Sequence, residues 1–187
     1  GHILQEIFPP HPAALLVGLS ITGLEVGSIY MYRVGWPMNI GFLVYTALAI
    51  VALLVVGHVM YGESLRGMQY LGVLLAAAGM FCIVRGPMKF WWPIGLIVFC
   101  STAYQVGVKE ISTGIHPLTA LVLTYLSASF ASFILYFFLA PQGENRKKEI
   151  FSWNPSALGL GFSIVGIELG VVYMYRAGWT VQTSFIL

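Results

Sequence analysis

The chain has 187 residues, of which 58% are hydrophobic and only 9% charged, and its net charge is +2. Because soluble domains carry about 25% charged residues, this composition excludes an ordinary soluble protein and predicts an all-α integral membrane protein. The small net charge gives no reason to expect a nucleic-acid partner. The partner expected first is the lipid bilayer.

Seven apolar runs follow one another along the chain: 13–32, 37–61, 67–84, 90–108, 117–140, 155–175, and a seventh that begins at 177. A membrane-spanning helix needs about 20 apolar residues, with a range of about 17–25, so all six complete runs qualify. Backbone groups in lipid must be paired within the protein, and each run is therefore expected to be helical. A tight turn at Gly35-Trp36-Pro37 and loops at 62–67, 85–89, 109–117 and 141–155 separate the runs.

The loops carry basic residues unevenly, and this imbalance predicts an orientation. One side of the membrane collects six of them, namely Arg33, Arg85, Lys89, Arg146, Lys147 and Lys148. The other side collects three, namely Arg66, Lys109 and Arg176. The count places the 144–149 loop in the cytoplasm and the start of the chain outside.

A duplication is the most informative feature of the sequence. Residues 23–36 read GLEVGSIYMYRVGW and recur at 166–179 as GIELGVVYMYRAGW, an offset of 143. Aligned at this offset, 11–40 and 154–183 share 15 of 30 residues. The second copy lies five spans after the first, so it is expected to cross the membrane in the opposite direction. This predicts an inverted-topology repeat, a pattern typical of transporters. Two complete 143-residue units would make 286 residues, so we interpret the chain as a fragment, with about 99 residues (286 − 187) outside it.

The order of the runs and one link between them resemble the EamA-like permeases of the drug/metabolite transporter superfamily. The link reads Tyr61-Gly62-Glu63-Ser64-Leu65, followed by Gln69, Gly72 and Gly79, and the close turn at 32–36 fits the same pattern. The resemblance implies a ten-helix (5+5) bundle, with the last three helices of unit one in 1–86 and the first helices of unit two in 87–187. It also implies transport of small metabolites or drugs across the cell (inner) membrane without a cofactor. Both termini would be cytoplasmic, which is opposite to the charge count.

Each copy of the repeat places one acid, Glu25 or Glu168, near the middle of an apolar span. A charged side chain there costs about 2.5–3.5 kcal/mol on insertion scales, and desolvation favours the neutral acid. Three interpretations remain open: a proton-coupling carboxylate, an anchor for a cationic group of a substrate, or a protonated acid hydrogen-bonded between helices. Glycines four residues apart flank both acids and favour close helix packing, so both acids are expected to face the centre of the bundle.

Further candidates for substrate contact are polar or aromatic residues within or at the ends of spans. They are the repeat pairs Tyr32 and Tyr175, and Asn39 and Gln182, together with Tyr104, Gln105 and Tyr125. Residues at span ends are predicted to lie at the interface or to form a gate, and these are Arg33, Arg176, Trp36 and Trp179. Interfacial aromatics and snorkelling arginines are common at such positions.

No residues are spaced as a metal, redox or hydrolytic site, and the sequence contains no Asp. The two cysteines, Cys82 and Cys100, are expected to be small buried thiols. The sequence therefore predicts a non-enzymatic transporter that carries a small-molecule substrate by alternating access, with no cofactor. The alternative is a non-transporting membrane assembly protein or a lipid-carrier flippase subunit. A transporter is expected to have a polar-lined central cavity, and an assembly subunit a filled centre and an open groove facing lipid.

Overall fold

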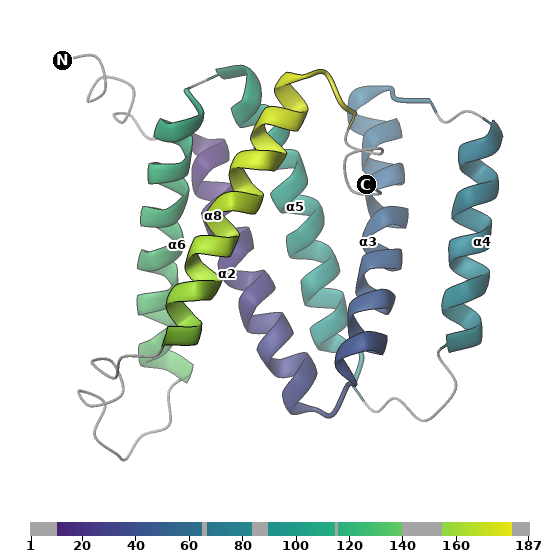
Figure 1. Ribbon diagram of the computed structural model, residues 1–187, viewed down its shortest axis with the longest axis horizontal. Helices are drawn as coiled ribbons and strands as arrows, with labels where there is room; N and C mark the ends of the chain where they lie inside the picture. The colour runs from purple at the N-terminus through teal and green to yellow at the C-terminus, as the bar shows by residue number, and fades with distance from the viewer. Residues whose placement is uncertain (1–10, 65–66, 84–89, 115, 140–154, 181–187) are drawn as a thin grey trace.

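A computed structural model describes residues 11–64, 67–83, 90–114, 116–139 and 155–180, and in these ranges its only regular elements are α-helices (Figure 1). In chain order they are α2 (Pro12–Arg33), α3 (Met38–Tyr61), α4 (Gly67–Ile83), α5 (Trp92–Gly114), α6 (Pro117–Leu139) and α8 (Pro155–Arg176). Each of the six complete apolar runs is a helix, which confirms the predicted fold class. Proline opens α2, α6 and α8, where its missing N–H costs no hydrogen bond.

One predicted boundary was wrong. The loop expected from 109 to 117 is largely helical, because α5 continues to Gly114. Polar residues at 109 and 110 indicated a loop, but Lys109 forms an ion pair with Glu63 and Glu110 accepts a hydrogen bond from Tyr61. These partners lie at the end of α3 and just beyond it, so the extra helical turns of α5 are held against α3.

Five of the helices, all except α4, are long and apolar enough to cross a membrane. The chain is thus a multi-pass membrane protein. The remaining helix, α4, has 17 residues, which is the lower limit for a membrane span. Among the described helices α4 packs only against α3 (Figure 1). Cys82 on α4 is consequently exposed, contrary to the prediction, whereas Cys100 on α5 is buried as expected.

The two copies of the repeat run in opposite directions. In Figure 1, α2 descends to the turn before α3, while α8 ascends. This agrees with the second copy lying five spans after the first. A twofold relation between two complete units remains a prediction.

Both copies end in the same cap. Gly35 and Gly178 have positive φ angles of 94° and 89°. The N–H of Gly35 donates to the carbonyl of Tyr32, and that of Trp36 donates to the carbonyl of Met31. The corresponding bonds recur one repeat later, from Gly178 and Trp179. This pair of bonds is the Schellman motif, in which glycine adopts the left-handed conformation at low cost. The repeated Gly-Trp pair is therefore a helix stop.

Helix α5 holds the bundle together, since α2, α3 and α8 all pack against it. The approach of α2 to α5 is close because glycines lie at the contact. A Cβ on Gly27 would lie 2.7 Å from Ile97 Cγ1, and a Cβ on Gly23 would overlap Cys100 Sγ. Helix α2 also packs against α6, where Gly18 faces the backbone of residues 124–128. This packing confirms the predicted role of the glycine pair in the first copy.

Candidate functional site

Among the described residues, Glu168 is the one acid that is buried, with 4% of its surface exposed. It lies in the middle third of α8, and the hydroxyl of Tyr104 on α5 donates a hydrogen bond of 2.9 Å to its Oε2. Tyr104 is itself 8% exposed. The prediction that the acid of the second copy faces the bundle interior is confirmed.

Three further predicted residues surround this pair. Tyr175, two turns along α8, donates a 2.6 Å hydrogen bond to Oε1 of Gln105, the neighbour of Tyr104 on α5. Tyr125 of α6 interacts electrostatically with Glu168, and its hydroxyl is shielded from solvent without a hydrogen-bond partner in the described part of the chain. We call Tyr104, Gln105, Tyr125, Glu168 and Tyr175 the buried polar cluster. Three helices contribute to it.

The cluster is embedded in the main hydrophobic core. Tyr104 and Tyr175 pack there with apolar side chains of α2, α3, α5, α6 and α8, among them Val17, Leu53, Val108, Leu123 and Val172. Hydrogen bonds inside such an apolar surrounding are electrostatically stronger than in water, and leaving one unmade is costly. The arrangement can hold a carboxyl group at a fixed position between α5 and α8, next to two further hydroxyls and an amide.

Glu25, the equivalent acid of the first copy, is not part of this cluster, and the prediction that it faces the centre was wrong. Its side chain is exposed on the side of α2 that borders α6. The described residues provide it with neither a hydrogen bond nor an ion pair. The same repeated sequence therefore has its glutamate buried in α8 and exposed in α2.

Helix geometry explains the difference. Successive residues are about 100° apart around a helix, so a residue midway between two glycines four positions apart lies on the opposite face. In α2 the glycine face packs against α5 and turns Glu25 outward. In α8 the setting is reversed, because Glu168 is buried while a Cβ added to Gly166 or Gly170 would meet no neighbouring atom within 4 Å. The predicted packing role of these two glycines is therefore not realised among the described residues.

The remaining predicted site residues do not join the cluster. Tyr32 and Arg33 are exposed at the end of α2, where Arg33 lies 6.0 Å from the ring centroid of Tyr30. Asn39 is exposed at the start of α3, and its Oδ1 accepts a hydrogen bond from the N–H of Ile40. In the second copy, Arg176 and Trp179 are also exposed. Gln182 lies outside the described residues.

Trp36 lies in the turn between α2 and α3, where it has a packing role. Only 6% of it is exposed. Its Nε1 donates to the carbonyl of Phe90 at 3.2 Å, and its ring meets Trp91 edge-on at 5.3 Å between centroids. The turn after α2 is thereby fixed to the start of α5.

A second polar group, which the sequence reasoning missed, lies where α3 and α5 end. The hydroxyl of Tyr61 donates to Oε1 of Glu110 at 2.8 Å. Lys109 pairs with Glu63 and lies 3.6 Å from the centroid of the Tyr61 ring. One sequence signal could have indicated this group. Lys109 and Glu110 follow an apolar run directly, and charged residues at that place are compatible with one more turn of the same helix. Tyr61 also packs against the core that contains the cluster.

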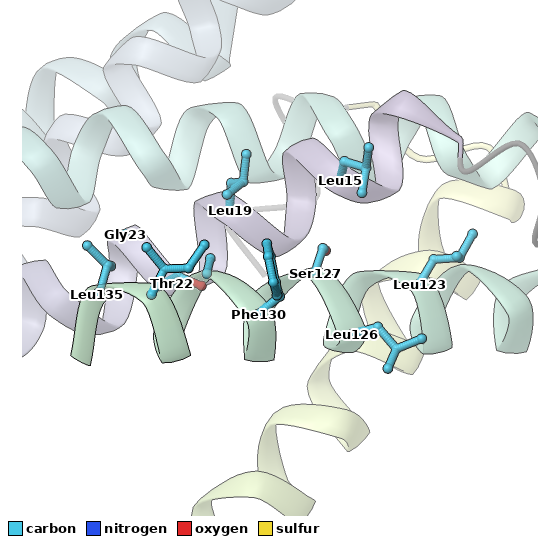
Figure 2. A pocket seen from close by; sticks show the side chains of 11 residues that line it. Leu15, Leu19, Thr22, Gly23, Leu123, Leu126, Ser127, Phe130 and Leu135 are labelled. Carbon is cyan, nitrogen blue, oxygen red and sulfur yellow. The ribbon is translucent and has the colours of Figure 1, made fainter. Parts of the chain in front are cut away.

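A groove runs along the outside of the α2–α6 pair (Figure 2). It has a volume of about 680 Å³ and is lined almost wholly by apolar side chains, including Leu15, Leu19 and Phe130. We call it the lateral groove. A separate pocket of about 490 Å³ is lined by Glu25, Arg33 and other residues of both helices. Gly23 lines the lateral groove and Glu25 lines the second pocket, so the two open on different faces of α2.

Thr22 also links the two helices that form the lateral groove. Its hydroxyl is within 3.2 Å of the carbonyl oxygen of Ala128 on α6 and within 3.1 Å of that of Gly18 on its own helix. This polar bridge is a second feature that the sequence reasoning missed, because a threonine inside an apolar run usually bonds only to its own helix.

Among the described residues, no group of three or more His, Cys, Asp or Glu side chains is placed to hold a metal ion. The chemistry available in the cluster is hydrogen bonding and proton exchange at one carboxyl group, supported by phenol and amide groups. In comparisons with known proteins, no family model, no curated protein and no solved structure matches this chain. The site must therefore be interpreted from its own geometry.

Proposed function

We propose that the protein is a membrane transporter that moves small metabolites or drugs by alternating access, with the buried polar cluster as its substrate or coupling site. One observation carries the proposal. Glu168 is buried in the middle third of a membrane-spanning helix and is hydrogen-bonded by Tyr104 of another spanning helix. Ionisable groups at such depth are costly and usually belong to substrate or proton pathways.

The cluster has the groups that such a role requires. The carboxyl group of Glu168 can bind and release a proton, or bind a cationic group of a substrate. Tyr104 orients that carboxyl by donating a hydrogen bond to it. The proposal agrees with the resemblance to EamA-like permeases, which we keep as part of it, and with a non-enzymatic role in the cell (inner) membrane.

The test is transport by the full-length protein in proteoliposomes, using a panel of radiolabelled metabolites. If Glu168 couples proton movement to transport, Glu168→Gln removes the titrating proton but keeps shape and hydrogen bonding. Substrate exchange should then persist, while accumulation driven by a pH gradient is lost. Loss of binding as well would assign the carboxylate to a cationic substrate.

The duplication provides a matched control. Glu25→Gln makes the same change at the equivalent position outside the buried polar cluster. Accumulation that survives in Glu25→Gln and fails in Glu168→Gln assigns coupling to the cluster. Full gradient-driven accumulation in Glu168→Gln would end the coupling hypothesis.

The lateral groove favours a second candidate function, that of a membrane assembly protein or a lipid-carrier flippase subunit. The groove opens on the outer side of α2 and α6, and most of its lining is apolar. Reconstituted protein would then move no metabolite from the panel. A flippase subunit would instead accelerate exchange of a fluorescent lipid-linked sugar between leaflets, and an assembly protein would do neither.

A further inference from the structure

We infer that protons reach Glu168 from one face of the membrane along a line of three tyrosines, Tyr61, Tyr175 and Tyr104, and that Glu110 is the surface group that takes them up. We call these five residues the proton path. The path extends the proposed coupling role of Glu168 and rests on it.

The inner end of the path consists of hydrogen-bonded side chains on α5 and α8. Tyr104 donates to Glu168, and Tyr175 donates to the amide oxygen of Gln105, the residue next to Tyr104. Tyr175 lies seven residues beyond Glu168 on α8, which is about 10 Å along a helix at about 1.5 Å per residue. These polar side chains therefore lead from the middle of the membrane toward the face at which α3, α5 and α8 end (Figure 1, top).

Tyr61 connects this inner part to the membrane surface. Tyr61 is the last residue of the α3 span, and Glu110 lies one residue before the end of the α5 span. Tyr61 packs against the core that contains Tyr104 and Tyr175, and Tyr175 interacts electrostatically with both of the other tyrosines. The hydroxyl of Tyr61 donates to Glu110, which is exposed. Polar side chains thus follow one another from the buried acid to the surface.

An ion pair holds the outer end of the path in place. Lys109 pairs with Glu63, and its ammonium group lies 3.6 Å from the centroid of the Tyr61 ring. A cation over an aromatic face is attracted to it, so the pair fixes the ring whose hydroxyl meets Glu110. The charged or titratable groups around Tyr61 therefore include Glu63, Lys109, Glu110 and Tyr175.

The opposite direction along α5 is apolar. Ile97 and Ile94, about two and three turns before Tyr104, are 1% and 0% exposed. They pack in a second apolar cluster, which contains Met31, Trp36 and Val44. Such a block contains no side-chain group that donates or accepts a proton. This difference between the two directions agrees with access to Glu168 from one face at a time, as alternating access requires.

Each step of the path moves one proton between two oxygen atoms. The carboxylate of Glu110 binds a proton from water and passes it to the hydroxyl oxygen of Tyr61, which gives up its own proton. The same exchange at Tyr175 and Tyr104 delivers a proton to Oε2 of Glu168. Glu110 is then ionised again, each tyrosine is neutral, and Glu168 has gained one proton. Tyrosine is suited to these steps because its hydroxyl both donates and accepts hydrogen bonds.

The test measures how fast Glu168 exchanges protons in the full-length protein in lipid nanodiscs, and it needs no substrate. Infrared difference spectroscopy after a pH jump follows the carboxylic C=O band, and the part of the signal that Glu168→Gln removes belongs to Glu168. Tyr61→Phe keeps the ring and removes the hydroxyl, and Glu110→Gln removes the surface proton acceptor. Both should slow the Glu168 signal several-fold. Tyr173→Phe, at an exposed position of the same helix as Tyr175, should leave the rate unchanged.

The outcomes separate the path from the coupling role. Slower exchange supports the path, and loosened packing does not explain it, because added water would speed exchange. Either variant is sufficient if the other does not fold. Rates equal to that of Tyr173→Phe would overturn the path and leave the coupling role of Glu168 in place. A wild-type signal that Glu168→Gln does not change would mean that Glu168 does not exchange protons, and both the path and the coupling role would then be wrong.

Discussion

The most direct test of the helix packing makes the same substitution at equivalent positions of the two repeats, Gly18→Ala and Gly161→Ala. A Cβ on Gly18 would overlap Ser127 Oγ and would lie 2.5 Å from the carbonyl oxygen of Thr124 and 3.0 Å from the N atom of Ala128. Ordinary Cβ contacts are 3.4–4 Å. The serine can rotate away, but the two backbone atoms of α6 cannot. Gly161 has no atoms within 4 Å of its Cβ position.

Both glycines lie inside helices, so both substitutions gain about 0.5–1 kcal/mol from helix propensity, and this gain cancels when the two variants are compared. Gly18→Ala alone adds overpacking, which costs about 1–3 kcal/mol. The free energy of unfolding of Gly18→Ala should therefore be about 1–3 kcal/mol lower than that of Gly161→Ala. At about 2–4 °C per kcal/mol for a chain of this size, the melting temperatures of the two variants should differ by about 2–12 °C.

The assay is thermal unfolding of the purified protein in one detergent, followed by the loss of monodisperse protein in fluorescence-detected size-exclusion chromatography. Wild type and both variants are measured side by side, because the prediction concerns the difference between them. Equal melting temperatures of the two variants would show that α2 does not approach α6 as closely as described.

Two further predictions use other features of the chain. Tyr175→Phe removes the buried 2.6 Å hydrogen bond to Gln105 and should lower the free energy of unfolding by about 1–2 kcal/mol. The same substitution at its repeat counterpart, Tyr32→Phe, changes an exposed position and should cost almost nothing in the same melting assay. Equal effects would contradict the finding that one tyrosine is buried and the other exposed. A cysteine at Asn145 is expected to resist an impermeant thiol reagent in intact cells, because the basic residues of its loop predict a cytoplasmic location, and rapid external labelling would instead support the orientation implied by the family resemblance.

Much of the fold follows from the sequence by simple physical rules. Apolar runs of spanning length must be helices in lipid, so the positions of the six helices could be predicted within a few residues at most ends. The number of spans between the copies indicated opposite directions for α2 and α8, and the turn predicted at Gly35-Trp36-Pro37 indicated where α2 stops. The error at the end of α5 arose because Lys109 and Glu110 have partners on a different segment, which no local pattern reveals.

The sequence could not determine which face of each repeat helix is buried, and the reason lies in the membrane environment. Apart from the glutamate, both helices are largely apolar on every side, and both lipid and protein accept apolar side chains, so hydrophobicity does not distinguish an inner from an outer face. Glycine on one face and glutamate on the other are identical in the two copies. Only the tertiary structure shows that the glycines of α2 face α5 and that the glutamate of α8 faces Tyr104. Neighbouring helices made this choice, since close backbone approach stabilises the glycine face in one copy and a hydroxyl donor stabilises the acid in the other.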